Sequence, residues 1–252
     1  MSLLPTRDAT DGDVVPCGKK SMIFASTRQR SKGLTKVIKT VFFPGYSYSK
    51  LRGGREHGTL SLRSARGRGK TVDRQLARCV GREATLPPRA THETRAVLEH
   101  IQGSGYYIES AQRPVGWAPW RVATWLDLVL RPVVLDHRPD HRVVVEVKRG
   151  CLYRRCSVPG AKSRHLDPAV GVSPIHMHQL QAEVGRQMLQ RVDPSLPVRA
   201  MLLYVDEAGV EAVTDFAVAW SAQTERALVE TSQLCAGRKR KAIRKRPSIP
   251  PK

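Results

Sequence analysis

The stretch that decides the fold is VVVEVKRG, residues 143–150. Consecutive β-branched apolar residues of this kind are typical of a strand buried inside a sheet. Because side chains alternate between the two faces of a strand, Glu146 and Lys148 share one face and three of the valines point to the other. A carboxylate and an ammonium inside an apolar strand must be paired or bound to a cation. The stretch therefore predicts a strand that carries an ionic site.

A second apolar run, TWLDLVL at residues 124–130, also contains a single acidic residue, Asp127. If the two strands are antiparallel neighbours, Asp127 lies beside Glu146. Two adjacent carboxylates repel each other unless a cation neutralises them, and their hard oxygen atoms suit Mg²⁺ or Mn²⁺ near a phosphate. Asp136 and Asp140 compete with Asp127 for this role, but they lie in a proline-containing turn where solvated acids are common.

The segments around these two strands have the patterns of an α/β domain. Thr91 is a candidate N-cap, and the residues after it have apolar side chains at helical spacing. The predicted elements are a helix over 91–101, strands over 105–112, 121–130 and 142–150, a helix over 175–190, a strand over 198–205 and a hairpin return over 210–216. We therefore expect a central mixed sheet flanked by helices.

Positive charge is concentrated at the two ends of the chain. The sequence has 43 Lys and Arg against 22 Asp and Glu, a net charge of +21. Residues 1–90 carry net +13, residues 91–236 are neutral, and residues 237–252 carry net +8. This distribution predicts a folded domain over 91–236, a partly disordered basic arm over 1–90 and a basic tail over 237–252. Basic flanks of this kind bind a polyanion by phosphate contact and counterion release, so the expected partner is DNA, with RNA as the other candidate.

The basic arm contains four segments with recognisable patterns. Residues 36–43 predict one short strand, and residues 72–80 a short helix. The two stretches rich in Gly and Arg, residues 51–55 and 64–71, predict flexible basic segments.

Composition also indicates a compartment. No stretch approaches the 18 or so apolar residues of a spanning helix, so we expect no membrane partner. The N-terminus lacks the apolar core of a secretory signal, and five scattered cysteines do not form a disulfide framework. The chain is expected to be intracellular. The basic tail fits a nuclear-import signal or a DNA-binding tail, so the expected location is nuclear in a eukaryote or in a virus that replicates in the nucleus.

The order of acidic and basic residues resembles that of the PD-(D/E)XK nuclease superfamily, in its lambda-exonuclease-like and RecB-like branch. Asp127 matches the acid of the second strand, and Glu146-Val147-Lys148 matches the Glu-x-Lys triplet of the third. The resemblance covers residues 91–216. It departs from the family at Leu126, where proline is usual, and at Glu183, where a tyrosine is usual. It implies a restriction-endonuclease-like core of helix, three strands, helix and strand.

The resemblance also implies a metal site. Asp127, Glu146 and the carbonyl group of Val147 would hold Mg²⁺ or Mn²⁺. Glu93, on the first helix of the domain, matches the accessory carboxylate of the family and would complete the metal site. An acid in the first turn of a helix is, however, also expected from the helix dipole alone.

The implied reaction is metal-dependent hydrolysis of DNA phosphodiester bonds in replication, recombination or repair, alongside other proteins of those processes. Lys148 would orient or deprotonate the attacking water and stabilise negative charge. Gln179, which resembles the glutamine motif of the family, would position Lys148 or the phosphate. The loop after the third strand is basic, and its candidate nucleic-acid contacts are Arg149, Arg154, Arg155, Lys162 and Arg164.

Three other interpretations remain open at the level of sequence. Glu146 and Lys148 also fit an ordinary salt bridge on an edge strand. The second interpretation is a non-catalytic nucleic-acid-binding or packaging protein that keeps the fold but uses only its basic flanks. The third interpretation is a zinc site, for which the candidate ligands are Cys151, Cys156, His165, His176 and His178.

Overall fold

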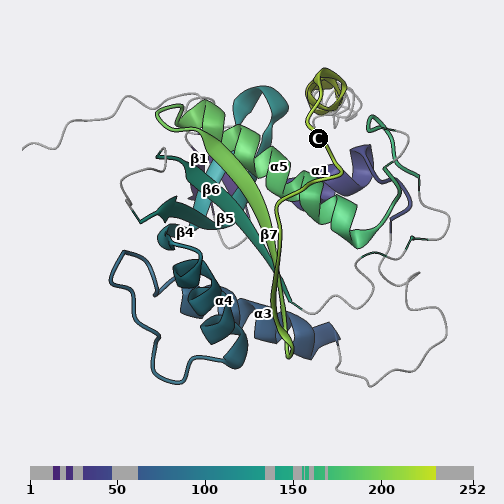
Figure 1. Ribbon diagram of the computed structural model, residues 1–252. Coiled ribbons are helices and arrows are strands. Elements are labelled where there is room, and N and C mark those ends of the chain that lie inside the picture. The colour runs from purple at the N-terminus through teal and green to yellow at the C-terminus, as the bar shows by residue number, and fades with distance from the viewer. Residues whose placement is uncertain are drawn as a thin grey trace, which may run out of the picture.

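A mixed β-sheet of six strands forms the centre of the protein, and helices cover both of its faces, as the computed structural model in Figure 1 shows. The fold class is therefore α/β, as the sequence predicts. The structure describes residues 14–17, 21–24, 31–46, 62–133, 140–149, 155, 157–158, 162–167 and 170–230.

Five strands follow one another across the sheet in the order β3-β5-β6-β7-β8, and β4 pairs with β5. Only the β3–β5 and β6–β7 pairs are parallel. A separate hairpin of β1 and β2 packs beside β4. The bounds are β1 Val14–Cys17, β2 Ser21–Phe24, β3 Lys32–Gly33, β4 Tyr106–Trp117, β5 Val122–Pro132, β6 Arg142–Arg149, β7 Val198–Asp206 and β8 Gly209–Val213, with a 3₁₀ turn η1 at Ala118–Trp120.

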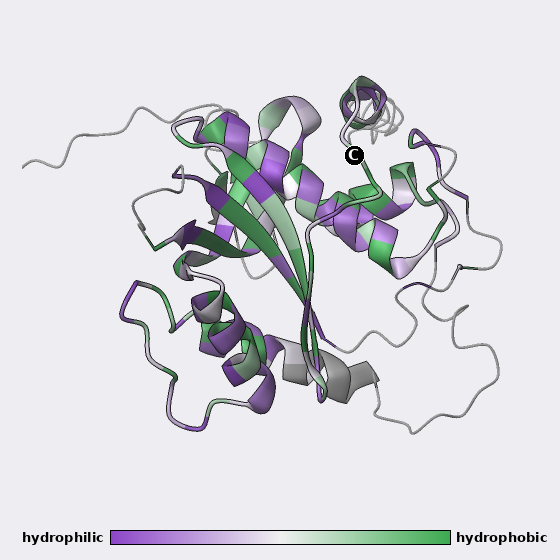
Figure 2. Ribbon diagram, in the orientation of Figure 1, coloured by the Kyte–Doolittle hydropathy of each residue, from purple (hydrophilic) through white to green (hydrophobic). Residues whose placement is uncertain are grey.

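The helices divide between the two faces of the sheet. α1 (Leu34–Val41) and α5 (Pro174–Val192) share one apolar core with the sheet, while α3 (Leu62–Leu76) and α4 (His92–Gly103) share another. Figure 2 shows the apolar residues gathered along the central strands, between these two layers. Alternation along β6 explains the division, because Val144 packs in the first core and Val143 and Val145 pack in the second.

Each element expected between residues 91 and 216 is present in the described structure, in the expected order. α4 begins after Thr91, whose side chain accepts a hydrogen bond from the backbone N–H of Thr94, as the capping pattern predicts. β4 and β5 extend several residues beyond the predicted strands, and β8 ends earlier, at Val213.

Two predictions for the N-terminal region are wrong. The expected strand over 36–43 is mostly the helix α1, because its apolar residues Leu34, Val37, Ile38 and Val41 recur at helical spacing and pack against the core. The expected flexible segment over 64–71 belongs to α3. That helix is anchored at its C-terminal end, where Val72 and Leu76 are buried.

The division of the chain at residue 90 rests on composition, and two helices on its N-terminal side belong to the cores. α1 contributes to the first core and α3 to the second. The expected flexible segment over 51–55 and the basic tail lie outside the described residues. Among the residues that the structure does describe, no helix is long and apolar enough to cross a membrane.

Candidate active site

The candidate site forms where β5 and β6 separate. Their antiparallel pairing runs from Leu130 to Leu128 on β5 and stops at the pair Leu128–Val145. The same edge of β5 pairs with β3 at Val122 and Ala123. Between these two pairings, no described strand pairs with this edge of β5, and Asp127 lies in that interval. Its carboxylate takes over the role of a backbone acceptor, since Oδ2 accepts a 3.0 Å hydrogen bond from the N–H of Val147.

Glu146 is the most enclosed charged group of the site, with 5% of its surface exposed. Its Oε1 atom forms an ion pair with Nζ of Lys148 and accepts a 2.5 Å hydrogen bond from Nε2 of Gln181 on α5. Burial, followed by repulsion from Asp127, raises the pKa of Glu146 to about 8, although Lys148 opposes the shift. The expected placement of Glu146 and Lys148 on one face, with Asp127 nearby, is thus present in the structure.

Asp73 is a third carboxylate of this site, and the sequence analysis missed it. It belongs to α3, whose Val72 packs in the same core as Leu128 and Val145, the last paired residues before the site. Burial, and then repulsion from Asp127, raises the pKa of Asp73 to about 6, while Lys148 lowers it. The available signal was that Asp73 is the only acid in an otherwise basic segment.

Glu93 does not join this group of carboxylates. Its Oε1 accepts a 2.6 Å hydrogen bond from Nε of Arg149 and is ion-paired with that guanidinium. Burial alone would raise the pKa of Glu93, but hydrogen bonds and the positive charge of Arg149 lower it. The structure therefore places Glu93 as the partner of Arg149, whereas Asp73 is the helical acid that interacts with Asp127.

Gln179 is buried, but the contact with Glu146 comes from Gln181 instead. The Oε1 atom of Gln179 has no hydrogen-bond partner among the described residues. Next to it, His178 is buried and its Nδ1 lies 3.0 Å from the hydroxyl group of Tyr204. Burial, followed by the positive charge of Lys148, holds the pKa of His178 well below its usual range, so the ring is neutral at pH 7.

The four predicted nucleic-acid contacts that the structure describes have different neighbours. Arg149 is paired with Glu93, and Arg155 is exposed with a guanidinium nitrogen 3.2 Å from Glu211. Lys162 and Arg164 are exposed, and their backbone N–H groups donate to the carbonyl oxygens of residues 44 and 42. Arg154 lies outside the described residues. Asp140, a competitor of Asp127, is exposed and paired with Arg131, and Asp136 is not described.

The oxygen donors of the site fit a divalent cation in chemical type. Mg²⁺ is commonly held by one or two carboxylates, with water and substrate phosphate completing its coordination. Asp127 and Glu146 could serve in this way once Lys148 moves away from Glu146. In the arrangement that the structure shows, no three His, Cys, Asp or Glu side chains among the described residues are grouped to hold a metal ion.

The zinc interpretation receives no geometric support from its described members. Cys151 and Cys156 lie outside the described residues. The ring of His165 packs edge-on against Phe42, and Nδ1 of His176 lies 2.7 Å from the carbonyl oxygen of Gly171. His178, as described above, contacts Tyr204. The three histidines thus have three separate sets of neighbours.

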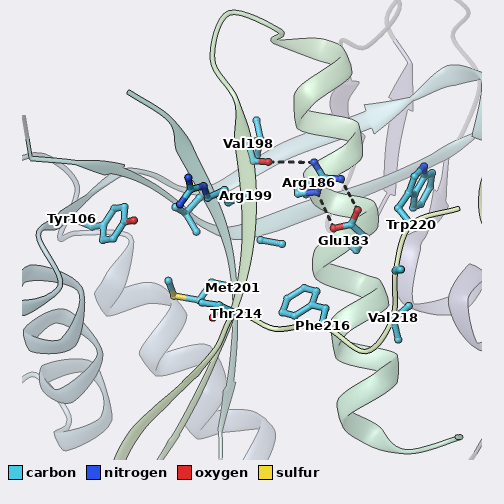
Figure 3. Close-up of a pocket in the computed structure, with 13 residues that line it drawn as sticks. Tyr106, Glu183, Arg186, Val198, Arg199, Met201, Thr214, Phe216, Val218 and Trp220 are labelled. Carbon is cyan, nitrogen blue, oxygen red and sulfur yellow. Dashed lines mark hydrogen bonds and ion pairs between the residues drawn. The ribbon is translucent and has the colours of Figure 1, made fainter. Parts of the chain in front are cut away.

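A groove of about 570 Å³ lies elsewhere, between the N-terminal half of β7, α5 and residues 214–220 (Figure 3). Figure 3 shows Arg186 ion-paired with Glu183 and hydrogen-bonded to the carbonyl oxygen of Val198 at 3.2 Å. Phe216 and Trp220 also line the groove, which includes none of the carboxylates of the candidate site. Within the groove the charges of Glu183 and Arg186 are paired with each other, whereas the carboxylates of the candidate site repel one another.

Comparisons with known proteins give no relative from which a role could be transferred. No protein-family model, curated protein or solved structure matches the chain. The functional argument therefore rests on the residues and their geometry.

Proposed function

We propose that the protein is a divalent-metal-dependent nuclease that hydrolyses DNA phosphodiester bonds, with a restriction-endonuclease-like core of the PD-(D/E)XK type. The observation that supports this proposal most strongly is the convergence of Asp127, Glu146 and Lys148 at the point where β5 and β6 separate. An edge-strand salt bridge explains Glu146 and Lys148 alone. It does not explain why two further carboxylates, Asp127 and Asp73, are close enough to repel Glu146 and to raise its pKa.

A bound divalent cation would polarise the scissile phosphate and activate water. Asp127 and Glu146 would hold it, with the carbonyl oxygen of Val147 as the adjacent backbone donor. Lys148 would then release Glu146 and face the substrate, where its ammonium group stabilises negative charge on the phosphate oxygens and positions the attacking water. Gln181 would keep the Glu146 carboxylate oriented through its hydrogen bond. The expected setting is DNA replication, recombination or repair inside the cell.

The test is cleavage of end-labelled linear DNA and of circular DNA in the presence of Mg²⁺, with a chelator control. Lys148→Ala and Glu146→Gln should each lower the cleavage rate by a factor on the order of 10² to 10⁴, because the first removes a charge that stabilises the reacting phosphate and the second removes a carboxylate that would hold the metal ion. Lys36→Ala removes an exposed lysine of α1 and serves as the matched control. Cleavage that survives both site substitutions would overturn the proposal.

One observation favours a second function, that of a non-catalytic nucleic-acid-binding protein. Lys148 is ion-paired with Glu146, so in this arrangement the lysine already neutralises the carboxylate that a metal ion would need. Such a protein would bind DNA through its net charge of +21, with an affinity that depends on salt and not on chelator. Intact DNA in the cleavage assay, together with chelator-insensitive binding, would support it.

A further inference from the structure

The basic helix α3 ends at the candidate site, and this placement has a consequence for how the substrate lies. α3 carries five arginine or lysine residues, and Asp73 is its only acid. Val72 and Leu76 fix the C-terminal half of the helix in the core behind β5 and β6. Figure 1 shows α3 below the ends of the central strands, on the side of the sheet that it shares with α4.

The face of α3 that carries Asp73 also carries the residues one helical turn earlier, farther from the site. Residues three and four positions apart lie on the same face of a helix, so Gly69 and Lys70 lie one turn, about 5.4 Å, before Asp73 on its side. Lys70 is exposed. A Cβ atom built on Gly69 would meet no other atom within 4 Å, so no packing against the protein requires a glycine there.

Glycine at position 69 is unfavourable for the helix itself. A glycine inside a helix is less favourable than alanine, because glycine loses more backbone freedom when the helix forms. Where neither packing nor an unusual backbone angle requires it, one reason for glycine is the close approach of another molecule to the backbone. Gly67 has no packing requirement either, so Gly69 is singled out by its position on the same helix face as Asp73. Beside an exposed ammonium group, that molecule is expected to carry negative charge.

We propose that the turn of α3 formed by Gly69 and Lys70 binds the phosphate backbone of the nucleic acid next to the scissile phosphate. Lys70 contacts a neighbouring phosphate, and Gly69 allows the sugar-phosphate chain to lie against the helix. This inference deepens the proposed function and rests on it for the position of the scissile phosphate. It gives α3 two tasks, since its next turn supplies Asp73 to the carboxylates.

The chain provides a matched pair of glycine substitutions. Gly67 lies on the same helix, about a third of a turn around from the face of Asp73, and a Cβ atom there would also meet nothing within 4 Å. Gly69→Ala and Gly67→Ala should both stabilise the helix and raise Tm by about 2 to 4 °C. Only Gly69→Ala should weaken DNA binding, by an expected three- to tenfold.

The binding experiment uses the full-length protein, a short DNA duplex and a chelator, so that binding is measured without cleavage. Lys70→Ala should reduce affinity several-fold and lower the slope of log K against log salt by about 0.9, the value for one lost phosphate contact. Lys36→Ala, an exposed lysine of α1, is the control for loss of charge alone. Equal effects of Lys70→Ala and Lys36→Ala, or of the two alanine-for-glycine variants, would overturn the inference.

The two proposals fail in different ways in these assays. The probe is a series of duplexes, each with one phosphate replaced by a neutral methylphosphonate. At the phosphate that Lys70 contacts, this replacement should lower the affinity of the Lys70→Ala variant less than it lowers the affinity of the unaltered protein. If that coupling exists but Mg²⁺ produces no cleavage, the contact stands and the nuclease proposal falls. If cleavage depends on Lys148 but no position couples to Lys70, the nuclease stands and the contact falls. RNA of the same sequence shows whether the surface distinguishes the two sugars.

Discussion

Asp73 lowers the stability of the metal-free fold because its charge is held near Asp127 in a partly buried position. Its pKa is raised from 3.8 to about 6, so the folded protein holds this proton more tightly than the unfolded chain does. The stabilisation that comes from binding this proton is complete below pH 3.8 and is lost as the pH rises through about 6. Asp73→Asn should therefore be more stable than the unaltered protein at pH 8, by about 1 to 2 kcal/mol after solvent screening, and no more stable near pH 3.5.

Thermal unfolding of both proteins from pH 3.5 to 8 in a chelator measures this difference. Asp206→Asn, which changes an acid of the β7–β8 hairpin, is the control for charge alone. A stability difference that stays constant over the whole range would mean that Asp73 does not interact with the site carboxylates.

The sequence predicted the carboxylate–lysine centre because strand alternation is a local rule. The spacing of Glu146 and Lys148 is enough to place them on one face, and the interruption of an apolar run singled out Asp127. Asp73 and Gln181 depend on how two helices pack against the sheet, which no local pattern contains. Gln179, two residues from Gln181, shows the difference, because a helix turns about 200° between them and only one reaches Glu146.

At the scale of elements, the position of α5 determines whether Gln181 reaches Glu146. α5 crosses the sheet closely at Gly185, where a Cβ atom would lie 2.9 Å from Cδ2 of Leu126 and 3.6 Å from Cγ1 of Val144. Gly185→Val should push the helix away from β5 and β6 and lower the free energy of unfolding by about 1 to 3 kcal/mol. Cleavage should fall as well, since Gln181 lies one turn away on the same helix.

Urea unfolding and the cleavage assay measure these two effects. Gly103→Ala, at the end of α4 where a Cβ atom meets nothing within 4 Å, is the control. An unchanged unfolding midpoint for Gly185→Val would show that α5 does not pack tightly at this crossing.

α1 shows where local prediction of an element fails. Residues 36–43 contain β-branched and aromatic residues that favour a strand, and their composition outweighed their spacing in the sequence analysis. The structure follows the spacing, because Leu34, Ile38 and Phe42 recur every four residues and become fully buried against α5 and the sheet. A helix with one apolar face gains more from this burial than its residues lose in helix propensity.

At the scale of the whole molecule, positive charge and core residues alternate along the N-terminal third of the chain. Net charge alone assigned residues 1–90 to a polyanion-binding arm, yet Phe42 and Phe43 are both 0% exposed. Stability and nucleic-acid affinity should therefore respond to different substitutions. The double substitution Phe42→Ala with Phe43→Ala keeps every charge, whereas deletion of residues 237–252 removes 8 positive charges.

The double substitution should cost at least the 3 to 5 kcal/mol typical of one buried phenylalanine, which is a large part of the stability of an ordinary domain. Deletion of residues 237–252 should leave the thermal unfolding of the domain unchanged, because half of these residues are Lys or Arg and the sequence of the tail offers little apolar surface for a core. It should weaken DNA binding and reduce the slope of affinity against salt, since fewer counterions are released. Calorimetry and binding at three salt concentrations separate the two effects. A double variant that unfolds at the normal temperature would return this segment to the role of a charged arm, because the two phenylalanines that follow α1 would then contribute nothing to the core.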